Sequence, residues 1–278
     1  MTKHMLFFGF GFSAEALARR LDPAVWKITG TSRSVEGAAK ISALGHEGMV
    51  FGDLDMIPAD VTHIVTSIPP DADGDLVLQK FSDQFAARAT TFEWVAYLST
   101  TGVYGDHGGG WVDETTFLTP NTERGRKRQS AEAAWAAVPG LPLQIFRLAG
   151  IYGPGRNVLE SLRDGSAKRV IRKGQVFSRI HVEDIAGILE ASIVRPDPGR
   201  AYNVADDEPC PPQDVISHGA ELLGIKPPPE IAFEDATLSP VGRSFFMDSK
   251  RVSNARVKDE LGYRFQFPDY RVGLRSLV

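Results

Sequence analysis

The sequence has little of what marks secreted, metal-binding or membrane proteins. One of its 278 residues is cysteine, Cys210, so an internal disulfide and a metal site of clustered thiolates are both excluded. No apolar run approaches the roughly 18 residues that a membrane-spanning helix needs. The formal net charge is only -4, which gives no electrostatic reason to expect nucleic acid or an anionic membrane as a partner. We therefore expect a cytoplasmic protein without a metal, whose partner is a small-molecule substrate or ligand.

What is present is the composition of a folded protein with a sizeable core. Hydrophobic residues make up 42% of the chain and charged residues 24%, which are ordinary shares for a globular protein. A length of 278 residues suits one large α/β domain, or a nucleotide-binding domain with a smaller cap, better than two independent domains.

Apolar segments rich in β-forming residues alternate with helix-period segments through the first two thirds of the chain. Strands are predicted at Met5–Phe10, Trp26–Thr31, Gly48–Phe51, His63–Ser67, Trp94–Ser99 and Leu143–Leu148, and helices at Ser13–Leu21, Val35–Leu44, Gly74–Ala89 and Glu123–Ala137. Nearly continuous apolar strands are typical of a parallel sheet covered by helices on both faces. With right-handed crossovers the predicted fold is a doubly wound sheet of the Rossmann type.

After about residue 155, proline and glycine become frequent and the rhythm changes. Further helices are predicted at Val182–Val194, Gln213–Leu223 and Ser253–Leu261. We interpret this part as a smaller, loop-rich C-terminal cap lobe of a single unit, 1–278. The Rossmann core is predicted to span mainly residues 1–165, with 178–206 returning to it, and the cap lobe mainly residues 166–177 and 207–278.

The most specific local motif is a glycine-rich turn between the first strand and the first helix. Residues 9–14 read G-F-G-F-S-A, a G-x-G-x-x-A pattern. Gly9 permits the tight turn, Gly11 lets the backbone approach a pyrophosphate, and the small Ala14 allows close packing of helix on strand. The helix start, with Phe12 and a capping Ser13, would hold the diphosphate of a dinucleotide. A plain glycine turn is the alternative interpretation.

The end of the second strand indicates which dinucleotide is preferred. A site for NAD usually has an acidic residue there, which accepts a hydrogen bond from the ribose 2′-hydroxyl. This chain has Ser32, Arg33 and Ser34 instead. Arg33 can pair with a 2′-phosphate and the two serines can donate to it, so NADP(H) is favoured and NAD(H) stays open. The alternative is that Arg33 is merely solvated.

Four later segments stand out: YLSTTGVYG at 97–105, RLAGIYGPGR at 147–156, SRIHVED at 178–184 and AYNV at 201–204. They resemble motifs of the short-chain dehydrogenase/reductase superfamily, in particular of its extended epimerase/dehydratase branch. Their order along the chain is that of the family. The resemblance implies that Ser67, Ile68 and Pro69 line the diphosphate, that Asp53 and Leu54 flank the adenine, and that Ser99 belongs to the cofactor site.

The chain departs from this family where the catalytic Tyr-x-x-x-Lys is expected. Residues 124–132 read RGRKRQSAE, which places Arg124 at the tyrosine position and Arg128 at the lysine position. Arginine stays protonated at physiological pH, so Arg124 cannot relay a proton. The resemblance therefore implies an atypical member that lacks the catalytic tyrosine.

Two interpretations of the arginine pair stay open. At i and i+4 of a helix the like charges repel, a cost that an anion bridging them would offset. Alternatively, they belong to a solvated basic face beside Glu123 and Glu132. The resemblance also places Thr100 at the family's catalytic Ser/Thr position, where its hydroxyl would hold a substrate oxygen or simply cap the next loop.

If the protein is an enzyme, another acid or base must replace the tyrosine. Tyr104 is the first candidate, because its loop leaves the end of the same strand as Thr100. Asp106, His107 and Tyr152 follow, and the glycine-rich loop around His107 would close over a ligand or be simply mobile. His181 and Asp184 are expected to cap and pack the following helix.

We carry two hypotheses for function. The first is an NADP(H)-dependent oxidoreductase, epimerase or dehydratase with non-standard acid/base residues. The second is a non-catalytic module that holds the dinucleotide and reports it to a partner. The sequence names no substrate and leaves the oligomeric state open, a homodimer included.

Overall fold

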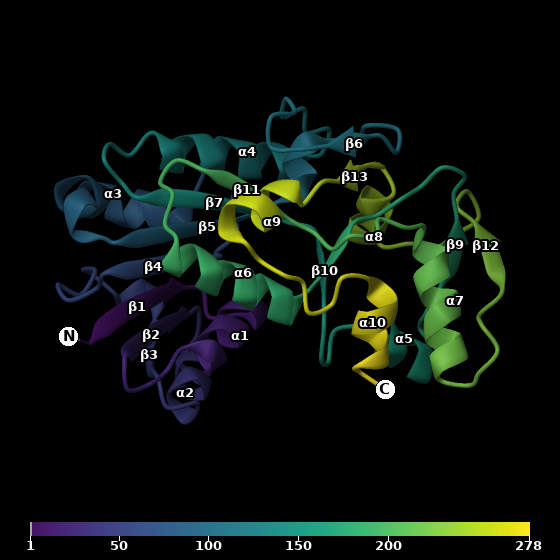
Figure 1. The fold of residues 1–278 in the computed structure, drawn as a ribbon, viewed down its shortest axis with the longest axis horizontal. Coiled ribbons are helices and arrows are strands. Elements are labelled where there is room, and N and C mark those ends of the chain that lie inside the picture. The colour runs from purple at the N-terminus through teal and green to yellow at the C-terminus, as the bar shows by residue number, and fades with distance from the viewer. Residues whose placement is uncertain (1) are drawn as a thin grey trace. The chain divides into compact units, whose positions relative to one another are not determined.

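The fold is organised by a seven-stranded parallel sheet in the computed structural model, which describes residues 2–278 (Figure 1). Its strand order is β3-β2-β1-β4-β5-β7-β11. The strands are β1 (Lys3–Phe8), β2 (Trp26–Ser32), β3 (Glu47–Val50), β4 (His63–Thr66), β5 (Trp94–Thr100), β7 (Leu143–Leu148) and β11 (Ala201–Val204). The chain moves from β1 to one edge and then returns to β4, so the order reverses between β1 and β4. The predicted Rossmann-type sheet is confirmed.

Helices cover both faces of this sheet, with α1, α2 and α6 on one face and α3 and α4 on the other (Figure 1). Their bounds are α1 (Phe12–Arg20), α2 (Val35–Ala43), α3 (Leu76–Arg88), α4 (Glu123–Ala136) and α6 (Val182–Val194). An ion pair between Arg20 and Glu190 joins α1 to α6 at 2.7 Å. Within residues 2–278, each helix is too short or too polar to span a bilayer.

The core beneath α3 and α4 is rich in aromatic side chains. Phe81 and Phe85 of α3 and Trp135 of α4 are buried against Phe8 and Tyr97 of the sheet. The rings of Phe85 and Trp135 meet edge to face, with centroids 4.9 Å apart. Aromatic burial of this extent stabilises the sheet by removing large apolar areas from water, and so fixes the strand ends that carry the site.

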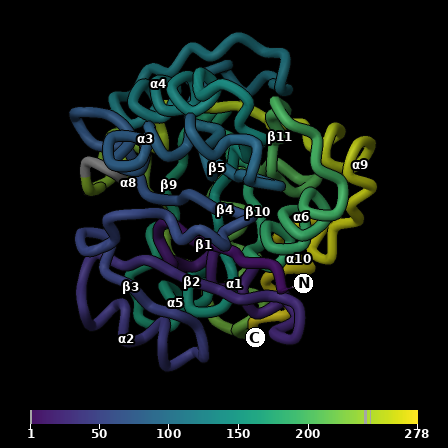
Figure 2. The backbone as a smooth tube through the Cα atoms, turned by 90° about the vertical axis from the view of Figure 1, so that its left-hand side faces the viewer, coloured from purple at the N-terminus to yellow at the C-terminus, as the bar shows by residue number. Residues whose placement is uncertain are grey.

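By its internal contacts the chain divides into two compact units. Unit 1 comprises residues 1–100, 126–147 and 185–202, and unit 2 comprises residues 101–125, 148–184 and 203–278. Unit 1 carries most of the large sheet. Its strands β1, β2 and β3 lie side by side in that order (Figure 2). The division into a cofactor core and a cap lobe is a functional one and stays a prediction.

Unit 2 is built from short elements. Its strands are β6 (Trp111–Val112), β8 (Gly150–Tyr152), β9 (Arg169–Ile171), β10 (Arg179–His181), β12 (Glu230–Ala232) and β13 (Arg251–Val252), and its helices are α5 (Val158–Arg163), α7 (Pro212–Leu222), α8 (Pro240–Phe245), α9 (Ala255–Leu261) and α10 (Tyr270–Arg275). The strands pair in parallel as β8 with β10, β9 with β12 and β6 with β13. Tyr152, Leu159 and Tyr270 form a small core with α7.

The first helix begins one residue earlier than predicted. Its N-cap is Gly11, and no side chain caps it. Ser13 lies buried inside the first turn, so its predicted capping role is wrong. The glycine turn brings Gly11 to the cap position, where its backbone carbonyl accepts the first hydrogen bond of the helix, from the amide of Glu15.

His63 of β4 is a buried titratable side chain that links stability to pH. Its side chain is 2% exposed, its Nδ1 lies 2.8 Å from the hydroxyl of Thr62, and its ring meets Trp26 edge to face. Burial lowers the pKa of His63 to about 4, against a partly compensating increase from Glu93. The unfolded chain therefore binds a proton at this residue before the folded chain does.

We predict that His63 contributes an acid-induced loss of stability. Because its folded pKa lies below the unfolded value of about 6.5, the contribution is full above pH 6.5 and is lost as the pH falls towards 4. Between pH 7 and pH 5 the loss is about 2 kcal/mol for this residue. Urea unfolding at both pH values should show a smaller drop for His63→Gln than for the wild type. Equal drops in the two proteins would contradict the assignment.

Candidate functional site

The turn between β1 and α1 is closed by two hydroxyl groups from neighbouring strand ends. The amide of Gly9 donates to the hydroxyl of Thr31 at 2.9 Å, and the hydroxyl of Ser67 donates to the carbonyl of Gly9 at 2.9 Å. Gly9 has a φ of 87°, and a Cβ there would lie 2.8 Å from the Ser67 oxygen. Both the backbone conformation and the space therefore require glycine.

Gly11 is exposed at the start of α1, and the open space beside its Cα is called the notch below. A Cβ at this position would meet no protein atom within 4 Å. The first intrahelical hydrogen bond runs from the amide of Glu15 to the carbonyl of Gly11 at 2.9 Å. The amides of the first turn point out of the helix start, which also carries the positive end of the helix dipole. The notch therefore fits a diphosphate, and Phe12, Ser13 and Ala14 supply its backbone wall.

The β2–α2 turn holds the three residues predicted to bind a 2′-phosphate. Arg33 is exposed. Ser34 is the N-cap of α2, and its hydroxyl accepts from the amide of Gly37 at 3.2 Å. Ser32 packs against the same glycine, since a Cβ at Gly37 would lie 1.8 Å from the Ser32 oxygen. Both serines thus have roles within the turn, and Arg33 is the exposed cation beside them.

The residues that the resemblance assigned to the adenine and diphosphate sides differ in exposure. Asp53 is exposed at the end of a short 3-10 helix, Phe51–Asp53, whereas Leu54 is buried in the aromatic core. Ile68 is half-buried against that core and Pro69 is exposed. Leu54 could therefore meet a ligand only through its backbone.

A buried charge cluster lies at the carboxyl end of β5. The hydroxyl of Ser99 donates to Glu132 at 2.5 Å, and Glu132 pairs with Arg147 of β7 at 2.8 Å. Glu132 and Arg147 are 4% and 8% exposed in their side chains. The next residue, Thr100, is half-buried. Ser99 thus serves the cluster, and Thr100 is the last residue of the strand.

Sequence reasoning missed this ion pair, although both partners lay in quoted motifs. Glu132 is the last residue of the segment RGRKRQSAE at 124–132, and Arg147 is the first residue of the segment at 147–156. An arginine in an otherwise apolar strand is the signal that could have found it, because a buried guanidinium needs a carboxylate partner.

The sequence left two interpretations of Arg124 and Arg128 open: an anion that bridges them, or a solvated basic face that both share. Both are wrong for Arg128, because its side chain is buried. Its guanidinium donates to the Tyr97 hydroxyl at 2.9 Å and to the carbonyl of Leu98 at 3.1 Å, and the residue is 8% exposed. Burial raises the pKa of Tyr97 to about 12, so this phenol stays neutral. Arg124, one helical turn earlier, is exposed. Arg128 is directed into the core because the phenol and a strand-end carbonyl satisfy its charge.

In unit 2, Tyr104 is a packing residue. It is fully buried, and its hydroxyl donates to the side-chain oxygen of Asn203 at 2.8 Å. The backbone amide of Asn203 donates to the carboxylate of Glu114 at 2.7 Å. Burial raises the pKa of the Glu114 carboxyl. The Tyr104 hydroxyl is not exposed, so its predicted role as a replacement acid or base receives no support from its position.

The glycine-rich loop around His107 is pinned to a distant segment. The amides of His107 and Gly109 donate to the carbonyl of Ser249 at 3.1 and 2.8 Å. The buried ammonium of Lys250 donates to the carbonyl of Gly105 at 2.7 Å, and the amide of Ser249 donates to Asp106 at 2.8 Å. These bonds contradict both a mobile loop and a loop free to close over a ligand.

The packing role expected for His181 and Asp184 agrees with their contacts. The Nδ1 atom of His181 accepts from the amide of Glu183 at 3.2 Å. Asp184 accepts from the Tyr263 hydroxyl and from the amide of Phe267, at 2.8 and 3.0 Å. Its carboxylate therefore ties the start of α6 to the segment after α9.

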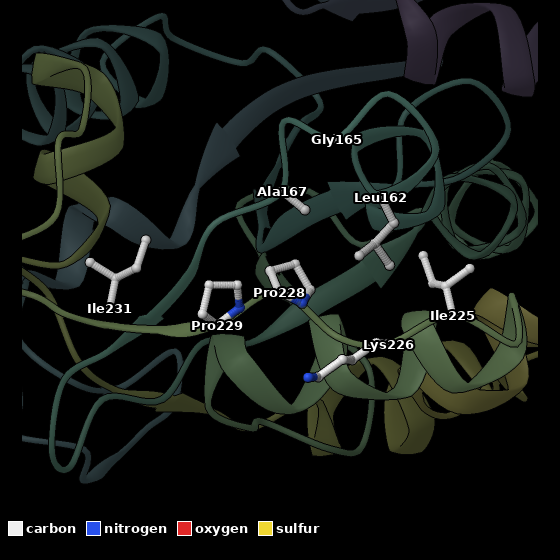
Figure 3. A pocket seen from close by; sticks show the side chains of 8 residues that line it. All are labelled: Leu162, Gly165, Ala167, Ile225, Lys226, Pro228, Pro229 and Ile231. Atoms are coloured by element: carbon white, nitrogen blue, oxygen red, sulfur yellow. The ribbon is translucent and has the colours of Figure 1, made fainter.

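A pocket of about 300 Å³ lies elsewhere in unit 2, beside α5, α7, β9 and β12 (Figure 3). It is lined by Leu162, Gly165, Ala167, Ile225, Lys226, Pro228, Pro229 and Ile231. None of the residues that the motifs single out lines it, so the pocket is not part of the candidate site.

The chain is similar in sequence and in structure to several known proteins. No protein-family model matches the chain. The solved structure of a functionally unknown conserved protein from Silicibacter pomeroyi DSS is 54% identical, with a TM-score of 0.95, covering 99% of this chain and 98% of that one. Protein YeeZ of Escherichia coli (strain K12) is 29% identical over an alignment of 282 positions, which covers 96% of this chain and 97% of that protein.

More distant solved structures are NAD-dependent epimerase/dehydratase proteins of the short-chain dehydrogenase/reductase superfamily. The human epimerase family protein SDR39U1, solved with NADPH, is 17% identical with a TM-score of 0.76, covering 99% of each chain. Other neighbours are a dehydratase and an epimerase solved with NAD, at 17% and 16% identity. At such identities the likeness establishes the fold alone.

We predict that the ion pair of Glu132 with Arg147 is a structural requirement of unit 1. Glu132→Gln or Arg147→Met alone leaves a buried charge without its partner and should cost about 3–5 kcal/mol of unfolding free energy. The double variant should cost clearly less than the sum of the two, because both charges are then gone. Urea unfolding measures all three.

The exposed pair of Glu15 with Arg19, 3.0 Å apart on α1, provides the control. Glu15→Gln should change the unfolding free energy by no more than about 1 kcal/mol. Additive losses at residues 132 and 147, or a loss for Glu132→Gln as small as that control, would contradict the assignment.

Proposed function

We propose that this chain, which belongs to the same family as the Silicibacter pomeroyi protein, binds a nicotinamide dinucleotide at the start of α1. We further propose that it prefers NADP(H) and acts as an atypical oxidoreductase, epimerase or dehydratase on a small molecule. The observation that carries the proposal is the open notch at Gly11, directly after a buried strand and before a helix. Both NAD and NADPH occur in the solved neighbours, which supports this class of cofactor.

In this proposal each part of unit 1 contacts one portion of the cofactor. The backbone of the first turn of α1 holds the diphosphate, and Ser67 keeps the turn closed from the other side. Arg33 approaches the 2′-phosphate as an exposed guanidinium, which suits bidentate pairing with phosphate oxygens. The bound nicotinamide would supply a hydride donor or acceptor. Thr100, at the end of β5, would hold a substrate oxygen with its hydroxyl.

The chain differs from the family that it resembles in the residues available for proton transfer. Position 124 carries an arginine, position 128 is used to anchor Tyr97 and Leu98, and Tyr104 is buried. A proton must therefore come from the substrate, from water or from a group in unit 2, which we propose as the substrate-binding part. The simplest balanced chemistry would be reduction of a carbonyl, in which the bound nicotinamide supplies a hydride to the carbonyl carbon and water supplies a proton to the resulting alkoxide oxygen.

The same observation favours a second candidate function. A protein that binds the dinucleotide without turnover needs the diphosphate notch and no proton relay. The use of Arg128 as a core anchor fits such a sensor as well as it fits an enzyme. The two candidates differ in whether hydride leaves the cofactor.

Titration with dinucleotides tests the binding site. We expect the wild-type protein to bind NADPH several-fold more tightly than NADH. Gly11→Val should weaken both by about 100-fold or more, because the new side chain occupies the space of the diphosphate. Gly11 has an extended backbone and no neighbour within 4 Å, so the variant should still fold. Fluorescence titration and circular dichroism provide the two measurements.

Ala133→Val is the control, because it adds bulk on the exposed face of α4. It should leave both affinities unchanged. Retained affinity in a folded Gly11→Val protein would remove the notch as the binding site. Equal wild-type affinity for NADPH and NADH would remove the proposed preference.

Hydride exchange separates the enzyme from the sensor. With NADPH deuterated at C4, an enzyme should transfer the label to one member of a panel of carbonyl compounds, as detected by mass spectrometry. Thr100→Val should lower that rate by about 10- to 100-fold without changing NADPH affinity, whereas Thr101→Val, the adjacent hydroxyl, should not. Tight binding without any label transfer would favour the sensor.

A further inference from the structure

Two arginines meet one aromatic ring in unit 2, and none of the three residues belongs to the candidate site. The strands β9 and β12 pair in parallel, so their carboxyl ends lie at the same edge of this small sheet (Figure 1). Arg172 follows β9, and Phe233 follows β12, with its amide donating to the carbonyl of Ile171 at 3.0 Å. Arg243 approaches the same ring from α8. We call Arg172, Phe233 and Arg243 the arginine cluster.

Both guanidinium groups of the arginine cluster lie over the ring of Phe233. The guanidinium carbon of Arg172 is 5.1 Å from the ring centroid, and that of Arg243 is 4.9 Å from it. The two positive charges therefore cannot be further apart than the sum of these distances, and they repel each other. The ring is fixed in turn, because it packs against the buried Phe246 with the two centroids 5.2 Å apart. The fold thus gathers two cations around one fixed side chain.

No carboxylate among the described residues neutralises these two cations. Neither guanidinium forms an ion pair there, and the exposed Glu234 and Asp235 form none with them although they directly follow Phe233. The polar contact of the Arg172 side chain is with a neutral group, the side-chain oxygen of the buried Gln175, at 3.5 Å. That amide is itself held by donation to a main-chain carbonyl at 2.6 Å. Arg172 is therefore positioned without losing its charge to a neighbour.

The first residue of β9 shows the opposite arrangement. Arg169 forms an ion pair with Glu230, its neighbour on β12, so its charge is balanced within the small sheet. A guanidinium that lies over a ring keeps its N–H donors available, because these donors lie in its own plane. Such donors match the oxygens of a phosphate or a carboxylate in both spacing and charge. An anion between or beside the two guanidinium groups would also offset their repulsion.

We infer that the arginine cluster is an oxyanion-binding site, which takes a small ligand with phosphate or carboxylate groups. Phe233 holds the two guanidinium groups, and their N–H donors bind the ligand oxygens. Two cations favour a ligand with several negative charges over one with a single charge. The site shares no residue with the notch at Gly11, so the inference goes beyond the proposed function and does not depend on it.

Calorimetric titration of the full-length protein with pyrophosphate, citrate and acetate at low ionic strength tests the site. We expect pyrophosphate or citrate to bind more tightly than acetate, and the tighter of the two identifies phosphate or carboxylate as the preferred group. Arg172→Gln and Arg243→Gln should each weaken this binding by about 3- to 10-fold, because each removes one charge beside the ligand. Phe233→Leu should weaken it as well, since the ring that holds both guanidinium groups is then absent.

Two further variants separate this site from other sources of anion binding. Arg264→Gln is the matched control, because it removes one exposed positive charge of unit 2 that is not part of the cluster. It should leave all affinities unchanged. Gly11→Val blocks the notch, which could itself accept pyrophosphate, and should leave the binding at the arginine cluster in place. Circular dichroism checks that each variant is folded.

The inference is overturned if neither polyanion binds, or if the double variant of Arg172 and Arg243 keeps the wild-type affinity. An equal loss in Arg264→Gln would show that only the net charge matters, and a loss confined to Gly11→Val would assign the anion to the notch. NADPH affinity, measured in parallel, should be unchanged in the cluster variants. A failure of the arginine cluster to bind anions therefore leaves the proposed function intact, and a failure to bind NADPH leaves this inference intact.

Discussion

The site depends on how Gly9 is held at the end of β1. Its amide and carbonyl are each bound by a hydroxyl, from Thr31 on one side and Ser67 on the other. These two residues follow or end the strands that flank β1, where the strand order reverses. The turn thus takes its geometry from both neighbours, and the direction of α1 follows from it. Gly11, two residues later, has open space beside its Cα.

A second constraint is the burial of two arginine side chains at the end of β5. Two arginines, at 128 and 147, are buried there, and each is satisfied by partners inside unit 1. The resemblance places Arg128 at the lysine position of the family's catalytic Tyr-x-x-x-Lys motif. Here its guanidinium fixes a phenol and a strand-end carbonyl, so the strand end is held without any ligand. The end of β5, which carries Thr100, is therefore held by contacts within unit 1.

Local patterns predicted most elements of unit 1 and, in unit 2, the helices α7 and α9, but few of the short strands of unit 2. Strand and helix periodicity and the glycine turn depend on neighbours in sequence, and β1, α3 and α4 agree with their predicted ranges to within a few residues. The failures involve partners far along the chain. Tyr104 is buried by Asn203 and the loop at His107 is pinned by Ser249, and no local signal encodes such pairs. The Ser13 cap failed differently, because the turn itself supplies the cap at Gly11.

The two parts of the proposed site differ in how the fold supports them. The turn at Gly9 is held by hydroxyl groups from two neighbouring strand ends, whereas Arg33 is exposed in the β2–α2 turn. The β2–α2 turn keeps its shape through Ser34, which caps α2, and through the contact of Ser32 with Gly37. The charge at residue 33 can therefore change with little effect on the core. A change of charge there leaves the hydrogen bonds of the turn at Gly9 in place, because none of them involves Arg33.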